Sequence, residues 1–117
     1  MTIKDIVENL PACVVTGPEG YQDLSVGEIV AGDLMSDILV SVETDALIVT
    51  SLASEQTVRS ADIVGARAII LVNDKLPLPS MKKLAEEAGI TLLETPMPMF
   101  ETCVTLGVLR NYNEKES

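Results

Sequence analysis

The chain has 117 residues, enough for one domain, and its 47% hydrophobic and 22% charged residues are typical of a globular protein. It contains no histidine, which excludes a Ser-His-Asp or Cys-His catalytic couple, a zinc–imidazole site and a histidine pH switch. Eight basic against 18 acidic residues, with two tyrosines, one phenylalanine and no tryptophan, exclude the usual nucleic-acid binder, which needs positive charge and stacking rings.

The first expected elements are a helix over residues 2–10 and a strand over residues 12–16. Thr2 and Asp5 have the spacing of a capping box, and apolar residues then recur at positions 3, 6, 7 and 10 on one helix face. Pro11 ends the helix, and the Gly-Pro-Glu-Gly sequence that follows the strand predicts a turn.

The middle of the chain alternates strands and helices. A weak strand over residues 26–30 precedes a helix that Asp33 is expected to cap and that runs to about residue 42. A third strand over residues 46–49 then leads to a helix with Ser54 at its N-cap position.

The strand over residues 68–72 is apolar at every position, which predicts burial on both faces, as in a parallel sheet covered by helices. Pro79 lies near the start of the next helix, and Gly89 lies at its C-cap. A fifth strand over residues 90–94 and a helix after Pro98, with apolar residues at positions 100, 103, 104, 107 and 108, complete the chain.

The strand–helix rhythm, repeated four times, predicts an α/β fold with three layers, α/β/α, around a largely parallel sheet of about five strands. We expect a single domain over residues 1–117, of which residues 110–117 form a polar, frayed tail. A chain of this size buries little apolar area, which favours pairing with a second copy.

The two cysteines, Cys13 and Cys103, form no CxxC motif, so we expect two buried, reduced thiols. The first residues carry an early acid and no long apolar run, unlike a signal peptide, and no segment approaches the ~20 apolar residues of a membrane span. These features predict a cytoplasmic protein that contacts neither membrane nor nucleic acid and holds no cofactor.

No Walker A, G-x-G-x-x-G or G-x-S-x-G motif occurs, but polar residues gather where the expected strands end. The carboxyl ends of parallel strands meet at one edge of a sheet, where ligands bind. The cluster has no nucleophile–base couple, so it suits a small ligand better than catalysis, and the alternative is ordinary caps and turns. Its members are Gly32, Asp33, Thr50, Ser51, Ser54, Asn73 and Asp74.

Two charged groups have competing interpretations. Asp33 and Asp37 lie one helical turn apart and could hold a hard cation, but a cap plus an exposed acid is the preferred interpretation, so no metal site is expected. Arg59 and Arg67 are expected in surface ion pairs, with Asp62 as a candidate partner, rather than at an anion.

The segment Met97-Pro98-Met99-Phe100 is unusually apolar for the approach to a helix. Met97, Met99 and Phe100 either fill the core or form a self-association patch, and the sequence favours neither.

Four segments of the chain match a known pattern in order and spacing: VAGDLMSD at residues 30–37, DALIVT at 45–50, AIILV at 68–72 and LAEEAGITLL at 84–93. With these segments the chain resembles the DRTGG domain over roughly residues 3–110. Ser-Leu-Ala-Ser-Glu stands where the family's Asp-Arg is expected, and Val-Asn-Asp stands where its Thr-Gly-Gly ends the fourth strand.

The resemblance implies the fold of the N-terminal domain of HPr kinase/phosphorylase, without the kinase active site. It implies a non-enzymatic regulatory or scaffolding role, homodimerisation, no catalytic residues, and a protein partner in a hydrogenase-type or other metabolic enzyme system. The family also occurs beside CBS domains in regulatory regions of inorganic pyrophosphatases. The alternative function is a sensor of a small ligand, a nucleotide among others, at the strand ends.

Overall fold

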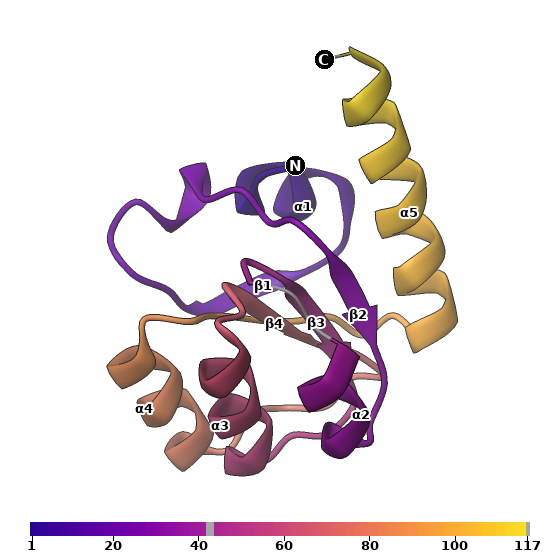
Figure 1. The fold of residues 1–117 in the computed structure, drawn as a ribbon. Coiled ribbons are helices and arrows are strands. Elements are labelled where there is room, and N and C mark those ends of the chain that lie inside the picture. The colour runs from indigo at the N-terminus through magenta and orange to yellow at the C-terminus, as the bar shows by residue number, and fades with distance from the viewer. Residues whose placement is uncertain (42–43, 117) are drawn as a thin grey trace.

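A computed structural model describes residues 1–41 and 44–116 of the chain (Figure 1). Its sheet has five strands in the order β1-β5-β4-β3-β2. Strands β2 to β5 run parallel to their neighbours, whereas β1 pairs with β5 in antiparallel fashion. The strands are β1 (Cys13–Thr16), β2 (Ile29–Ala31), β3 (Leu47–Thr50), β4 (Ala68–Leu71) and β5 (Thr91–Glu94).

Helices cover both faces of the sheet, which confirms the expected three layers (Figure 1). One face carries the crossover helices that join the parallel strands: α2 (Met35–Ser41), α3 (Glu55–Val64) and α4 (Pro79–Ala88). The other face carries α1 (Ile3–Asn9), α5 (Met99–Glu116) and the loop that contains the short 3-10 helix η1 (Tyr21–Asp23).

The core consists of two apolar clusters, one on each side of β3 and β4. Every residue of these two strands is fully buried, as the unbroken apolar run predicts. Successive side chains point to opposite faces, so Ile69 packs beneath α2, α3 and α4, and Ile70 packs beneath α1 and α5.

Local signals in the sequence account for several helix boundaries. Thr2 and Asp5 form the predicted capping box, with the Thr2 N–H donating to Asp5 Oδ2 at 2.9 Å and the Asp5 N–H to Thr2 Oγ1 at 3.2 Å. The hydrogen bond from the Thr2 backbone is the main cause that lowers the pKa of Asp5. Pro79 begins α4, and Gly89 closes it with a φ of 70°, a left-handed conformation that glycine adopts without steric cost.

Two sequence expectations about elements are wrong. The strand predicted over residues 26–30 forms as β2, Ile29–Ala31, while Val26 is buried in the loop before it. The tail predicted to fray from residue 110 instead continues α5 to Glu116, because a polar segment without glycine or proline contains no signal that ends a helix. The predicted end of the preceding helix near residue 42 lies outside the described residues.

The cysteines are both free, but Cys13 is exposed, contrary to the expectation of two buried thiols. It begins β1, which is an edge strand of the sheet. Cys103 on α5 is half-buried against the core, and this burial raises the pKa of its thiol. Among the described residues, no helix combines the length and the apolar run that crossing a bilayer would require.

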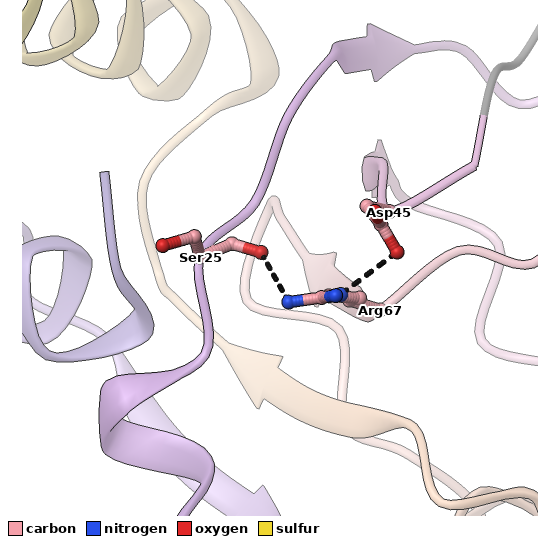
Figure 2. Close-up of polar contacts among 3 residues, drawn as sticks. All are labelled: Ser25, Asp45 and Arg67. Atoms are coloured by element: carbon pink, nitrogen blue, oxygen red, sulfur yellow. Dashed lines mark hydrogen bonds and ion pairs between the residues drawn. The ribbon is translucent and has the colours of Figure 1, made fainter.

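Arg67 lies just before β4 and connects this segment to the loop at Ser25 and to Asp45, which lies shortly before β3 (Figure 2). Its Nε donates to Asp45 Oδ1 at 2.8 Å, and its Nη1 donates to the backbone carbonyl of Ser25 at 3.0 Å. Arg59 pairs with Glu55 at 3.5 Å, one turn earlier on α3. Both arginines form the expected surface ion pairs, but with Asp45 and Glu55 in place of Asp62.

We expect Ile70→Ala to lower the free energy of unfolding by about 2–5 kcal/mol, because it opens a cavity beneath α1 and α5. The matched control is Ile63→Ala, since Ile63 on α3 is 75% exposed and its truncation should change stability by no more than about 0.5 kcal/mol. Urea unfolding measures both variants. Equal losses would contradict the burial of Ile70 beneath α1 and α5.

Candidate functional site

The parallel direction of β2 to β5 brings their carboxyl ends to one edge of the sheet, where the predicted polar cluster lies. The structure divides this cluster into two groups. One lies around Asp33, between the ends of β2 and β3, and the other around Asn73 and Asp74, between the ends of β4 and β5.

Asp33 joins the end of β2 to the loop that follows β3. Its Oδ1 accepts hydrogen bonds from Thr50 Oγ1 at 2.9 Å and from the Ser51 N–H at 2.7 Å, and its Oδ2 accepts from Ser51 Oγ at 2.7 Å. The Gly32 N–H donates to the Val49 carbonyl at 3.0 Å, which extends the pairing of β2 with β3 and aligns Asp33 with these donors. The expectation that Asp33 caps the following helix is therefore wrong, because α2 begins two residues later, at Met35.

The hydrogen bonds to Asp33 stabilise its charged form. The Ser51 side chain and then the Ser51 backbone are the largest causes that lower the pKa of Asp33, and Thr50 adds to them. Thr50 itself is fully buried, and its Oγ1 also accepts from the Leu52 N–H at 3.2 Å. A carboxylate with a lowered pKa is a poor proton acceptor at neutral pH, so this group fixes the loop better than it moves protons.

Ser54 lies at the N-cap position of α3, as predicted, but its side chain does not cap the helix. Its Oγ is buried and has no hydrogen-bond partner among the described residues. The loop is held instead by Thr57, whose Oγ1 donates to the Leu52 carbonyl at 2.7 Å. Sequence reasoning missed Thr57, although a threonine in the first turn of a helix is a recurrent partner of the preceding loop.

Asn73 and Asp74 form a turn that closes against the end of β5. Both have a φ of 59°, their side chains are exposed, and their N–H groups donate to the carbonyls of Met97 at 2.8 Å and Thr95 at 3.2 Å. Thr95 directly follows β5 and is buried, and its Oγ1 donates to the Pro11 carbonyl at 3.0 Å.

The chain leaves β4 toward α4 on one face and leaves β5 toward α5 on the other, the arrangement that opens a ligand crevice in many α/β sheets. Here a cavity of about 60 Å³ remains, lined in part by Cys13, Asp74 and Lys75. That volume admits water but is well below the ~300 Å³ of a typical ligand pocket. Among the described residues, no three Cys, Asp or Glu side chains gather where they could hold a metal ion.

The residues of the apolar segment at the start of α5 differ in their burial. Met97 and Met99 pack against the core beneath α1 and α5, whereas Phe100 is 74% exposed. Filling the core is therefore confirmed for the two methionines, and self-association stays a prediction that rests on Phe100.

Phe100 begins a row of exposed apolar side chains along α5. Val104 is 48% exposed and Val108 is 65% exposed, each one turn further along the helix; we call these three residues the α5 stripe. A hollow of about 600 Å³ lies beside the stripe, between α1 and α5, and is lined by Asn9, Val104, Thr105, Val108 and Leu109. Exposed apolar area of this kind marks contact surfaces.

We expect Asp33→Ala to lower the free energy of unfolding by about 1 kcal/mol at neutral pH, because three donors lose a charged acceptor at a partly solvated position. The pKa of Asp33 is lower in the folded chain, so its stabilisation is complete above the unfolded value of about 4 and is lost as the pH falls through the folded value. The difference from wild type should therefore vanish in acid.

Urea unfolding across a pH series measures this effect, with Asp62→Ala on the exposed surface of α3 as the control. A loss for Asp33→Ala that persists unchanged into acid would contradict the role of the charged carboxylate.

Comparison with known proteins supports the resemblance noted in the sequence. A family model of the DRTGG domain matches residues 5–107. No curated protein matches the chain.

Among solved structures, the chain is similar to the CBS and DRTGG domains of the regulatory region of Clostridium perfringens pyrophosphatase, in complex with its activator diadenosine tetraphosphate. The TM-score is 0.76 at 14% sequence identity, over 89% of this chain and 45% of that one. The chain thus spans about half the length of that structure, and the likeness is one of fold. Because the family model covers nearly the whole sequence and the α/β fold agrees, the chain belongs to the DRTGG domain family.

Proposed function

We propose that this DRTGG domain is a non-enzymatic regulatory module that acts by protein contact, first of all with a second copy of itself. The observation that carries the proposal is a contrast within the structure. At the strand ends Asp33, Thr50 and Ser51 bond to one another, whereas along α5 three large apolar side chains face solvent.

The chemistry of the strand ends supports a role without catalysis. Asp33 accepts three hydrogen bonds and has a lowered pKa, so it is a weak general base. The chain also contains no histidine that could take that role. Ser51 Oγ donates to Asp33 Oδ2, but the lowered pKa of that carboxylate makes it a weak base for activating the hydroxyl.

The family supports a regulatory role. The similar DRTGG domain of Clostridium perfringens belongs to the regulatory region of a pyrophosphatase. By analogy we propose that this chain regulates or assembles a metabolic enzyme system, a hydrogenase-type system among the candidates. The exposed, unpaired thiol of Cys13 fits a reducing compartment, which supports the proposed cytoplasmic location.

A second candidate function is a sensor of a small ligand, and one observation favours it. The Ser54 Oγ is buried without a partner at the N-terminus of α3, where helix N–H groups point outward. A ligand that donates a hydrogen bond there would satisfy it. Glu55 in the first turn and nearby Asp33 work against an anionic ligand, since both are acidic.

One experiment tests both functions. Light scattering over a concentration series should give the mass of a dimer, because the α5 stripe is an exposed apolar surface that a second copy could cover. Thermal unfolding of the same sample against nucleotides, phosphorylated metabolites and divalent ions should show no shift. A ligand present at 100 times its Kd would add about 2.7 kcal/mol of stability, which is a visible change in Tm.

A monomeric mass at every concentration would overturn the self-association proposal. A ligand-dependent rise in Tm that Ser54→Ala abolishes, while Ser80→Ala at the start of α4 leaves it intact, would establish the sensor instead.

A further inference from the structure

We infer that residues 75–79, which lead into α4 and which we call the Leu-Pro segment, dock into an aromatic-lined groove with an acidic rim on a partner protein. The inference rests on the proposed role in protein contact, and it names a surface for a protein other than a second copy. It is carried by the backbone conformation of the segment, by its exposed leucines and by the lysines in and beside it.

The Leu-Pro segment has the backbone of a polyproline II helix. Leu76 and Leu78 each precede a proline, which restricts their backbones to extended conformations. Leu78 has a φ of −70° and a ψ of 151°, close to the values of about −75° and +145° in that helix. The rings of Pro77 and Pro79 hold φ near about −65°. The sequence thus imposes this conformation residue by residue.

Both ends of the Leu-Pro segment are held by the domain. The Lys75 N–H donates to the Val72 carbonyl at 3.2 Å, and the Leu78 carbonyl accepts from the Lys82 N–H at 3.1 Å. Met81, in the first turn of α4, is fully buried and fixes that turn on the core. A segment ordered in advance loses little conformational entropy when a partner binds it.

The leucines of the segment face solvent. Leu76 is 68% exposed and Leu78 is 52% exposed, whereas Pro77 between them is half-buried. A polyproline II helix has three residues per turn, so the side of Pro77 lies toward the domain and the two leucines lie outward. Among the described residues, the Pro77 carbonyl has no hydrogen-bond partner. Aromatic-lined grooves recognise this kind of backbone and its flanking apolar side chains.

Charge defines the rim of that groove. The chain has a net charge of −10, yet between Asp74 and Glu86 it carries three lysines and no acidic residue. Lys75, Lys82 and Lys83 are exposed, and the ion pairs found in the described part of the chain involve none of them. Acidic groups beside a groove are repelled by most of this chain and attracted here, so charge directs the partner to the Leu-Pro segment.

A second copy of the chain does not have the chemistry of this partner. The chain contains one phenylalanine, two tyrosines and no tryptophan. Tyr21 in η1 packs against the core, and Phe100 lies in the first turn of α5. Three rings, one of which packs against the core, are too few to line a groove. The partner is therefore a different protein.

Binding to purified proline-recognition domains tests the inference. The probes are WW and SH3 domains that have acidic residues beside their grooves, titrated with the full chain. Tryptophan in their grooves reports binding by fluorescence, and this chain contains no tryptophan to obscure the signal. We expect at least one probe domain to bind with a Kd of about 100 μM or tighter, and its affinity to fall as salt is added.

Matched variants locate the contact. Leu76→Ser combined with Leu78→Ser should raise the Kd at least about tenfold, because two apolar side chains leave the groove. Pro77→Ala keeps both leucines and should raise the Kd by about two- to fivefold, since the segment becomes more flexible. The control is Ile63→Ser, at a 75% exposed residue of α3, which should leave the Kd unchanged. Circular dichroism confirms the fold of each variant.

The outcomes separate this inference from the proposed self-association. Failure of every probe domain to bind, or binding that the double leucine variant leaves intact, overturns the docking role of the Leu-Pro segment. Neither result bears on the mass of the wild-type chain, which light scattering measures without a probe. A monomeric chain that binds a probe domain through its leucines supports the docking role and overturns only the self-association.

Discussion

Complete burial of two neighbouring strands, β3 and β4, is the constraint on which the rest of the fold depends. A strand that exposes neither face must be covered twice, and a parallel neighbour can be reached only by a crossover. The crossover helices α2, α3 and α4 cover the first face of the sheet. The second face is left for the two ends of the chain, so α1 and α5 have to meet there from opposite ends of the sequence. The meeting of the carboxyl ends of β2 to β5 at one edge of the sheet follows from the same constraint, since parallel strands end on the same side.

Sequence reasoning worked where the cause is local or periodic. The apolar run at residues 68–72, the Thr2 capping box and the glycine after α4 each act within a few residues, and each is confirmed. Sequence reasoning failed where a side chain has possible hydrogen-bond partners both nearby and far away in the sequence. Asp33 has the pattern of a helix cap, but the register of β2 against β3 supplies better donors across the sheet. The partner of Arg67 likewise depends on how loops meet in space. The fold could thus largely be predicted from the sequence, whereas the partners of the side-chain hydrogen bonds and ion pairs could not.

The candidate site shows why composition at a sheet edge says little about ligands. The hydroxyl, amide and carboxylate groups that would bind a small molecule are also the groups that satisfy loop backbones, and buried polar atoms seldom stay unpaired. The sequence located Asp33, Thr50 and Ser51 at the correct edge, but only their distances show that they bind one another. Ser54 is the exception within this loop. Conversely, the sequence left Phe100 open between core filling and self-association and showed Val104 only as part of a helical pattern, and the structure shows that both side chains are exposed.

The antiparallel pairing of β1 with β5 has a consequence for how the chain assembles during synthesis. β1 is the first of the five strands to be made, yet its partner β5 is the last of the five. The parallel strands β2 to β5 can join one after another as they emerge, because each pairs with the strand that follows it. β1 must wait, with its apolar residues uncovered, until β5 has been made. Closure of that edge is therefore a late event in folding, and a nascent chain stalled before β5 exposes both β1 and the unpaired side of β4, two surfaces on which chaperones and misassembly act.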